Sequence, residues 1–313
     1  MRKIITRAAM GLHWDDRVGS NTEESLMTSF TSSRRQSLKG LALFGVGLAV
    51  TGLNGPSAAL AQDAAIKDED ILQFALNLEY LETEFYLRAT TGKGIEAADA
   101  GSDAGEVKGG RKVTFQNKAI GEFAQELAEN ELAHVRFYRK ALGSSAVARP
   151  TVDFEGGFAA IAKAIGMPDF DPFANDMNFL LAGMLIEDVG VTAYVGALPL
   201  LKKKEYVEAA AGILAVEAYH MGMARSQLYE MGDKAQKAAE AISKARDKLD
   251  GPEDRDQGIE RGGRANVVPS DADGIAFRRT PQEVLRIVYL TDQSGVSSGG
   301  LYPKGMNGTI KST

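Results

Sequence analysis

The sequence contains no cysteine, and only three histidines and one tryptophan occur among its 313 residues. The absence of cysteine excludes disulfide bonds, thiolate metal sites and cysteine nucleophiles, so a metal site must use oxygen and imidazole ligands. Positive charge is also scarce, because 36 lysines and arginines face 42 aspartates and glutamates, for a net charge of -6. This balance argues against a nucleic-acid partner, since phosphate binding needs a dense basic surface.

Residues 1–61 have the pattern of an export signal. Arg34 and Arg35 precede an uncharged run over residues 40–53, which small residues follow. The run of about 14 residues is shorter than the roughly 20 that a membrane-spanning helix needs, so we expect a removable signal peptide and no permanent membrane anchor. The arginine pair resembles the twin-arginine signal, although Ser37 stands where that signal usually carries phenylalanine. We therefore expect an exported protein in the periplasm or cell envelope.

The remaining chain contains four long stretches with the apolar periodicity of helices. They cover residues 68–89, 117–142, 176–198 and 204–231. The connection over residues 143–175 is long enough for the second and third helices to run parallel, as in bundles with one crossover. We therefore predict an all-α fold, with a four-helix bundle over residues 62–232 and a helical and loop extension over residues 233–313 that forms no second core.

Both histidines beyond residue 61 follow a glutamate by three positions, as Glu131 with His134 and Glu217 with His220. On a helix this spacing places carboxylate and imidazole on one face, within reach of the same metal ion. With 42 acids in 313 residues, both histidines would have an acid at this offset by chance with a probability of about 0.02. The two pairs therefore predict two metal-binding helices.

The other two long helices each carry a glutamate followed seven residues later by a tyrosine, as Glu79 with Tyr86 and Glu187 with Tyr194. Seven residues are two helical turns, so both side chains share a face. The alternation of the two patterns predicts two related helix hairpins that face each other. Their four carboxylates would be unstable in a core without cations, whereas two divalent ions neutralise them.

This ordered set resembles the ferritin-like superfamily of dinuclear carboxylate proteins, over roughly residues 68–232. Residues 76–88 and 299–307 also look like an exported bacterial branch described as ferritin-like or desiccation-related. The resemblance implies terminal ligands Glu79 and Glu187, bridging ligands Glu131 and Glu217, and one imidazole per metal from His134 and His220. It also implies that Tyr86 and Tyr194 donate hydrogen bonds to ligand carboxylates, with simple core packing as the alternative.

Glu82 is a further candidate ligand. It lies one turn after Glu79 on the more central apolar stripe of its helix, whereas the matching position of the third helix is Gly190. Glu82 is therefore either an additional ligand or the ligand in place of Glu79. Asp188 points about 100° away from Glu187 on a helix, so we expect it at the surface or behind the ligands.

Carboxylate ligands with one imidazole per metal suit iron or manganese better than zinc or copper. We expect two iron ions that react with oxygen or peroxide, in a ferroxidase-like or peroxide-detoxifying protein of envelope stress defence. Two manganese ions with catalase-like activity are one alternative, and a non-catalytic stress or desiccation protein with a structural metal site is another. The long first connection and the carboxyl-terminal extension argue against an iron-storage cage, while the question of a smaller homo-oligomer stays open.

Overall fold

The computed structural model describes residues 66–313, so the expected signal peptide over residues 1–61 lies outside the described residues. The four long helices are α3 (Asp68–Thr91), α5 (Lys118–Leu142), α7 (Asp176–Ala197) and α8 (Lys204–Glu230). The shorter helices are α4 (Ala97–Ala100), α6 (Phe154–Ala164), α9 (Asp233–Asp250) and α10 (Pro281–Tyr289). The predicted all-α class is confirmed, and each long helix begins and ends within two residues of its predicted bounds.

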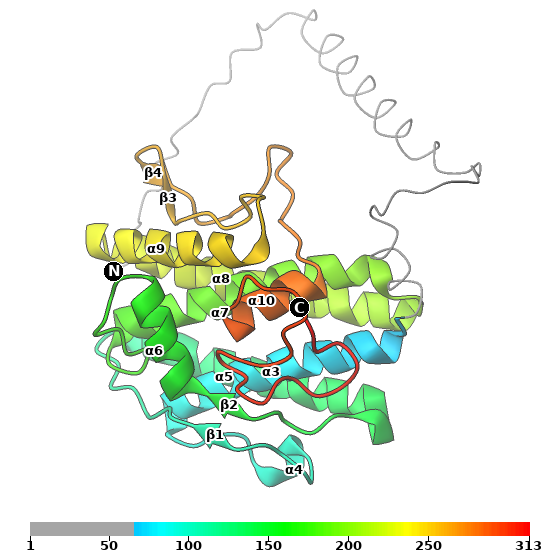
Figure 1. Cartoon of the computed structure of the whole chain (residues 1–313). Helices are drawn as coiled ribbons and strands as arrows, with labels where there is room; N and C mark the ends of the chain where they lie inside the picture. Colours follow the sequence, from blue (N-terminus) through cyan, green and yellow to red (C-terminus); the bar gives the residue numbers. More distant parts are fainter. Residues whose placement is uncertain (1–65) are drawn as a thin grey trace, which may run out of the picture. The chain divides into compact units, whose positions relative to one another are not determined.

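The long helices form two hairpins, α3 with α5 and α7 with α8, which pack against each other (Figure 1). α3 and α5 run antiparallel, because the Val113 N–H, shortly before α5, donates to the Ala89 carbonyl near the end of α3 at 2.8 Å. α7 and α8 are joined by a 3-10 turn at Leu198–Leu200, where Pro199 ends the regular helix.

Two aspartates at helix starts connect the hairpins. Asp68, the first residue of α3, accepts the backbone N–H groups of the two residues before α8, at 2.9 and 2.8 Å. Asp176, the first residue of α7, accepts those of the two residues before α5, at 3.0 and 2.8 Å. α5 and α7 therefore start at the same end of the bundle and run parallel, as the long crossover predicts.

The crossover contains a short strand and α6. Strand β2 (Val152–Asp153) pairs in parallel with β1 (Val107–Lys108) from the first connection, with Val107 opposite Val152. Asp153 then caps α6 by accepting the Gly156 N–H at 2.8 Å. A second small ribbon, β3 (Glu260–Arg261) with β4 (Arg264–Ala265), lies in the loop after α9. These two-residue strands were not predicted.

α7 is the central helix of the fold. Of its 22 residues, 18 are buried, because α3, α8, α9 and α10 all pack against it. Within residues 66–313, the segment Asp176–Leu200 is the one helix long and apolar enough to cross a membrane, and 89% of its apolar window is buried inside the fold. Its composition is therefore that of a core helix.

The carboxyl-terminal extension packs into the same core. α9 and α10 contact α7, and their apolar residues belong to the hydrophobic cluster of the bundle (Figure 1). The tail contacts α3 directly, since Tyr302 Oη donates to the Asn77 carbonyl at 2.8 Å. Asn77 and Asn307 also exchange two hydrogen bonds, at 2.9 and 3.0 Å. The two segments singled out by resemblance, residues 76–88 and 299–307, therefore contact each other.

Asp188 joins α7 to α8 and α9. It is 5% exposed and accepts hydrogen bonds from Arg225 at 2.8 Å and Arg246 at 2.7 Å. We expected Asp188 either at the surface or behind the ligands, and the surface position is wrong. Asp188 lies behind the ligands, where two buried guanidinium groups compensate its charge. Arg225 also donates to three carbonyls of the loop after α9, at 2.8 to 2.9 Å, which holds this loop on the bundle.

Candidate metal centre

All seven predicted ligands lie inside the four-helix bundle. They are Glu79 and Glu82 on α3, Glu131 and His134 on α5, Glu187 on α7, and Glu217 and His220 on α8. The four glutamates of the two repeated patterns are 0% exposed, and His134, the most exposed of the seven, is 8% exposed. Solvent therefore provides almost no stabilisation to these charged groups, and their partners must come from the protein or from bound ions.

The ligand atoms form two sets, and within each set the atoms lie within 4.8 Å of one another. One set consists of Glu79, Glu131, His134 and Glu217, and the other of Glu131, Glu187, Glu217 and His220. Because Glu131 and Glu217 belong to both, two carboxylates lie between two imidazoles whose ring centroids are 6.5 Å apart. The arrangement matches two adjacent metal ions that share Glu131 and Glu217. Each ion would have one further glutamate and one histidine that belong to its own set only.

The imidazoles face the carboxylates through Nδ1. His134 Nδ1 lies 3.2 Å from Glu79 Oε2 and 3.3 Å from oxygens of both Glu131 and Glu217. His220 Nδ1 lies 2.9 Å from Glu131 Oε1 and 3.6 Å from Glu187 Oε2. Each imidazole therefore contacts the glutamate that belongs to its own set only and at least one of the two shared glutamates.

The Asn130 side chain holds the opposite edge of the His220 ring, with its Nδ2 3.3 Å from Nε2. A metal-binding histidine donates its distal N–H to an acceptor, and a turn of about 180° of the Asn130 amide would place its oxygen in that position. Sequence reasoning missed Asn130, since it lies on α5 while its partner lies on α8, and no spacing rule connects the two.

The electrostatics of the centre require positive charge. Burial raises the pKa of Glu79 to about 7, and burial together with the neighbouring carboxylates holds the pKa values of Glu82 and Glu217 well above their usual range. Burial also raises the pKa of Glu131, but the two nearby imidazoles of His134 and His220 outweigh it and lower this pKa to about 2. Although burial lowers it, the pKa of His220 is raised to about 11 by Glu187 and Glu131. Protons or metal ions must therefore neutralise the carboxylates.

Several ligand atoms of the centre make no hydrogen bond of normal geometry with a described residue, and where another group is close, as with His220 Nδ1 and Glu131 Oε1 at 2.9 Å, it is a second ligand atom. They are Glu131 Oε1, Glu187 Oε2, both carboxylate oxygens of Glu217, and His220 Nδ1. A buried polar atom without a partner costs about 1–3 kcal/mol, so five in one place need an explanation. All five are of the atom types that bind metals, carboxylate oxygen and imidazole nitrogen, and the residues present therefore fit a pair of metal ions.

The two predicted tyrosines connect the hairpins at the centre. Tyr86 on α3 donates to Glu187 Oε1 on α7 at 2.5 Å, and Tyr194 on α7 donates to Glu79 Oε1 on α3. The hydrogen bonds expected from the resemblance are therefore present, and they follow the two-fold relation of the hairpins. The Tyr138 hydroxyl lies 2.9 Å from that of Tyr194 and extends this chain. Tyr138 lies four residues after His134 on the same helical stripe, a signal to which sequence reasoning gave no role.

Glu82 lies beside the centre but in neither set of ligand atoms. A Cβ atom added at Gly190 would be 3.0 Å from Glu82 Oε1 and 3.2 Å from Glu217 Oε2. The Glu82 carboxyl group therefore fills the space that a side chain at position 190 would need. Of the two candidates on α3, Glu79 is the one placed with the other ligands, while Glu82 lines the centre next to Glu217.

A third group of acids, Asp247, Asp250 and Asp256, is neutralised within the protein. Arg246 lies 2.7 Å from Asp256, and Arg279 donates to Asp250 at 2.8 Å. Burial and the Asp256 charge raise the pKa of Asp247 to about 6. Two guanidinium groups already pair with Asp250 and Asp256, so these acids belong to an ion-pair network.

A four-helix bundle with one crossover and two adjacent sets of glutamate and histidine ligands defines the ferritin-like class of dinuclear carboxylate proteins. The chain belongs to this family: the family model described as a ferritin-like domain matches residues 67–230. The family predicted from the sequence is therefore confirmed.

Two named proteins are similar to this chain over most of its length. The chain is 31% identical over 265 residues to the ferritin-like catalase Nec2 of Nesocodon mauritianus. The aligned region covers 78% of this chain and 84% of that protein. The chain is 35% identical over 249 residues to the desiccation-related protein PCC13-62 of Craterostigma plantagineum, and this aligned region covers 71% of this chain and 78% of that protein. No solved structure matches the chain.

Proposed function

We propose that the chain is a dinuclear metal oxidoreductase that removes hydrogen peroxide, with two iron ions as its metals. The observation that carries the proposal is the set of five buried, unpartnered ligand atoms on Glu131, Glu187, Glu217 and His220. Similarity to a protein named as a ferritin-like catalase supports peroxide as the substrate. Oxidation of ferrous iron by oxygen or peroxide is a second reaction that the same site could support.

Metal identity follows from ligand chemistry. Sets with three carboxylates and one imidazole suit iron or manganese, so two manganese ions with catalase-like activity are the alternative. Such a metal pair would pass two electrons from one molecule of hydrogen peroxide to a second, so that two molecules of hydrogen peroxide give one of oxygen and two of water.

The protein's own residues supply the geometry. Glu131 and Glu217 would hold the two ions together, while Glu79 and Glu187 would each complete one set. The hydroxyls of Tyr86 and Tyr194 fix the orientation of these two terminal carboxylates by donating hydrogen bonds to them. The bundle excludes water from the ligands, since all four glutamates are fully buried.

The test combines metal analysis with activity. Protein purified without chelators should contain two iron or two manganese ions per chain and release oxygen from hydrogen peroxide. Glu131→Gln keeps the size of a shared ligand but removes its charge, and should lower oxygen release at least about a hundredfold. Glu126→Gln, an exposed change on the same helix, is the matched control and should stay within about twofold. Full activity in the Glu131→Gln variant would contradict the proposal.

A non-catalytic role is the second candidate, and similarity to a protein named as desiccation-related favours it. In that case the metals would only stabilise the bundle. The same variants decide between the two roles. Wild-type protein without peroxide turnover, together with unfolding of the Glu131→Gln variant, supports the structural role. A folded Glu131→Gln variant without activity supports the catalytic one.

We further propose that residues 1–61 direct export and are removed. The proposal rests on the paired arginines, the short apolar run and the small residues that follow it. Mass spectrometry of the protein from the cell envelope should find an amino terminus at Gln62. An uncleaved chain confined to the cytosol would contradict it.

A further inference from the structure

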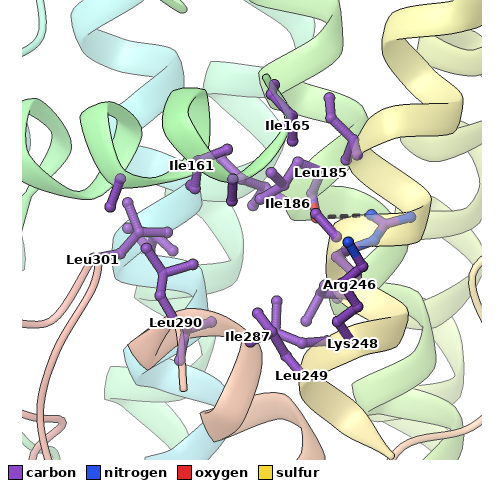
Figure 2. Close-up of a pocket in the computed structure, with 18 of the residues that line it drawn as sticks. Ile161, Ile165, Leu185, Ile186, Arg246, Lys248, Leu249, Ile287, Leu290 and Leu301 are labelled. Atoms are coloured by element: carbon purple, nitrogen blue, oxygen red, sulfur yellow. Dashed lines mark hydrogen bonds between the residues drawn. The ribbon is translucent and has the colours of Figure 1, made fainter. Parts of the chain in front are cut away.

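An apolar cavity of about 270 Å³ lies next to the metal centre. Side chains from α3, α6, α7, α9 and α10 and from the tail line it, and nearly all of them are aliphatic (Figure 2). Leu185 and Ile186 of α7, Ile161 of α6 and Ile287 of α10 point into it (Figure 2). An aliphatic space of this size favours apolar molecules over water.

The inner wall of the cavity is the wall of the metal centre. Glu82 and Gly190 line the cavity, and the position of a Cβ at Gly190 is 3.2 Å from Glu217 Oε2. No side chain at position 190 separates the two spaces. The Glu82 carboxyl group lies at this boundary, with Oε1 3.0 Å from the position of a Cβ at Gly190, and is the one acidic group that lines the cavity.

The outer end opens between α6 and α9. Ala160 and Ala164 of α6 and Lys248 of α9 line this end and are exposed. The nearby Arg246 is already paired, with Asp188 and with the Leu185 carbonyl at 3.2 Å (Figure 2). Lys248 is in no ion pair with another described residue, and it therefore provides a cation at the mouth of an aliphatic cavity.

We propose that the cavity binds an unbranched aliphatic carboxylate of medium length, with the chain inside and the carboxylate at Lys248. At about 30 Å³ for each water-sized group, the volume accommodates on the order of nine heavy atoms, which indicates a chain of eight to ten carbons. The inner end of such a chain lies against Glu82 and Gly190. Binding in this position requires the cavity and Lys248 and does not require the metals.

The first test measures binding of straight-chain carboxylates to the purified full-length protein by calorimetry. Each added methylene that enters the cavity should tighten binding about threefold to fourfold, so decanoate should bind at least tenfold tighter than hexanoate. Hexadecanoate should bind no tighter than decanoate, because the cavity is then full. Absence of saturable decanoate binding, or affinity that keeps rising to hexadecanoate, overturns the proposal.

The second test concerns the head group. Lys248→Gln should weaken decanoate binding at least fivefold and leave decanol binding unchanged. Lys237 is an exposed residue of α9 that does not line the cavity, so Lys237→Gln is the matched control. It should change neither decanoate binding nor decanol binding. Decanol that binds wild-type protein as tightly as decanoate overturns the assignment of the carboxylate to Lys248.

The third test locates the ligand and uses the absence of cysteine from the chain. Ala159 and Ala160 are adjacent exposed residues of α6, and only Ala160 lines the cavity. Saturating decanoate should slow maleimide labelling of the Ala160→Cys variant at least fivefold and leave the Ala159→Cys variant unaffected. Equal protection of both, or of neither, overturns the proposal. All three tests are repeated after chelation, so that loss of the metals and loss of the ligand are observed separately.

Discussion

At the scale of single residues, the difference between Glu82 and Gly190 breaks the two-fold relation of the two hairpins. Glu79 and Glu187 are equivalent, and so are Tyr86 and Tyr194, but the positions three residues after the two glutamates differ. Glu82 occupies the space that its counterpart leaves free. One side of the centre therefore carries an extra acid and borders the apolar cavity.

The first prediction follows from this crowding. In Gly190→Ala, the new methyl group would lie 3.0 Å from Glu82 and 3.2 Å from Glu217 and displace both carboxyl groups. We expect metal affinity to fall about tenfold, while the helix itself gains up to about 1 kcal/mol of propensity. Gly212→Ala on α8, where nothing lies within 4 Å of the added methyl group, should show the gain in helix stability without the loss of metal affinity. Metal titration and thermal unfolding measure both, and equal metal affinity in the two variants would refute the crowding.

The second prediction concerns pH. With a pKa of about 7 for Glu79 and about 11 for His220, both groups hold protons at pH 6 that metal ions must displace. These raised pKa values mean that metal affinity increases with pH. We expect at least about a tenfold increase per pH unit between pH 6 and pH 8, because each displaced proton contributes one factor of ten. Manganese titrations at several pH values measure it, and a flat profile would show that the ligands are not protonated.

At the scale of elements, the start of each helix pair depends on a single aspartate. Asp68 and Asp176 each accept two backbone N–H groups from the opposite hairpin. Asp68→Ala and Asp176→Ala should each lower the free energy of unfolding by about 1–3 kcal/mol, because two N–H donors lose their acceptor. Glu69→Ala, an exposed change in the first turn of α3, should have an effect within about 0.5 kcal/mol. Chemical denaturation provides the comparison, and similar values for all three variants would contradict the role of these caps.

The long helices could be predicted because their apolar periodicity extends over six or more turns, and the spacings of glutamate, histidine and tyrosine then placed the ligands on the inner faces. The two-residue strands could not be predicted, since no periodicity exists at that length. Contacts between distant segments were also missed. The Asp68 and Asp176 caps, the Asn130 contact to His220 and the cavity beside Gly190 depend on how helices pack and not on spacing within one helix.

At the scale of the whole molecule, the extension after α8 completes the core and does not form a separate body. Buried ion pairs join it to the bundle, with Asp188 of α7 between Arg225 of α8 and Arg246 of α9. Sequence reasoning expected no second core in this extension, and the apolar residues of α9 and α10 belong to the hydrophobic cluster of the bundle. It could not predict that residues 299–307 contact Asn77, two positions before the ligand Glu79. No pattern in either segment indicates which other segment it packs against.

The fourth prediction tests this connection. Asp188→Ala leaves two buried guanidinium groups without their shared carboxylate and should lower the free energy of unfolding by about 3–5 kcal/mol. Asp254→Ala, an exposed acid in the loop after α9, is the control and should change it by less than about 0.5 kcal/mol. Urea denaturation followed by circular dichroism measures both. A small effect of Asp188→Ala would mean that the extension is not held by this network.

The central claim is that two metal ions share Glu131 and Glu217 inside the bundle. Anomalous X-ray diffraction from crystals of the metal-loaded protein tests it most directly. The account predicts two peaks about 3.5–4 Å apart, one nearer His134 and the other nearer His220. A single peak, or peaks outside the two sets of ligand atoms, would contradict it.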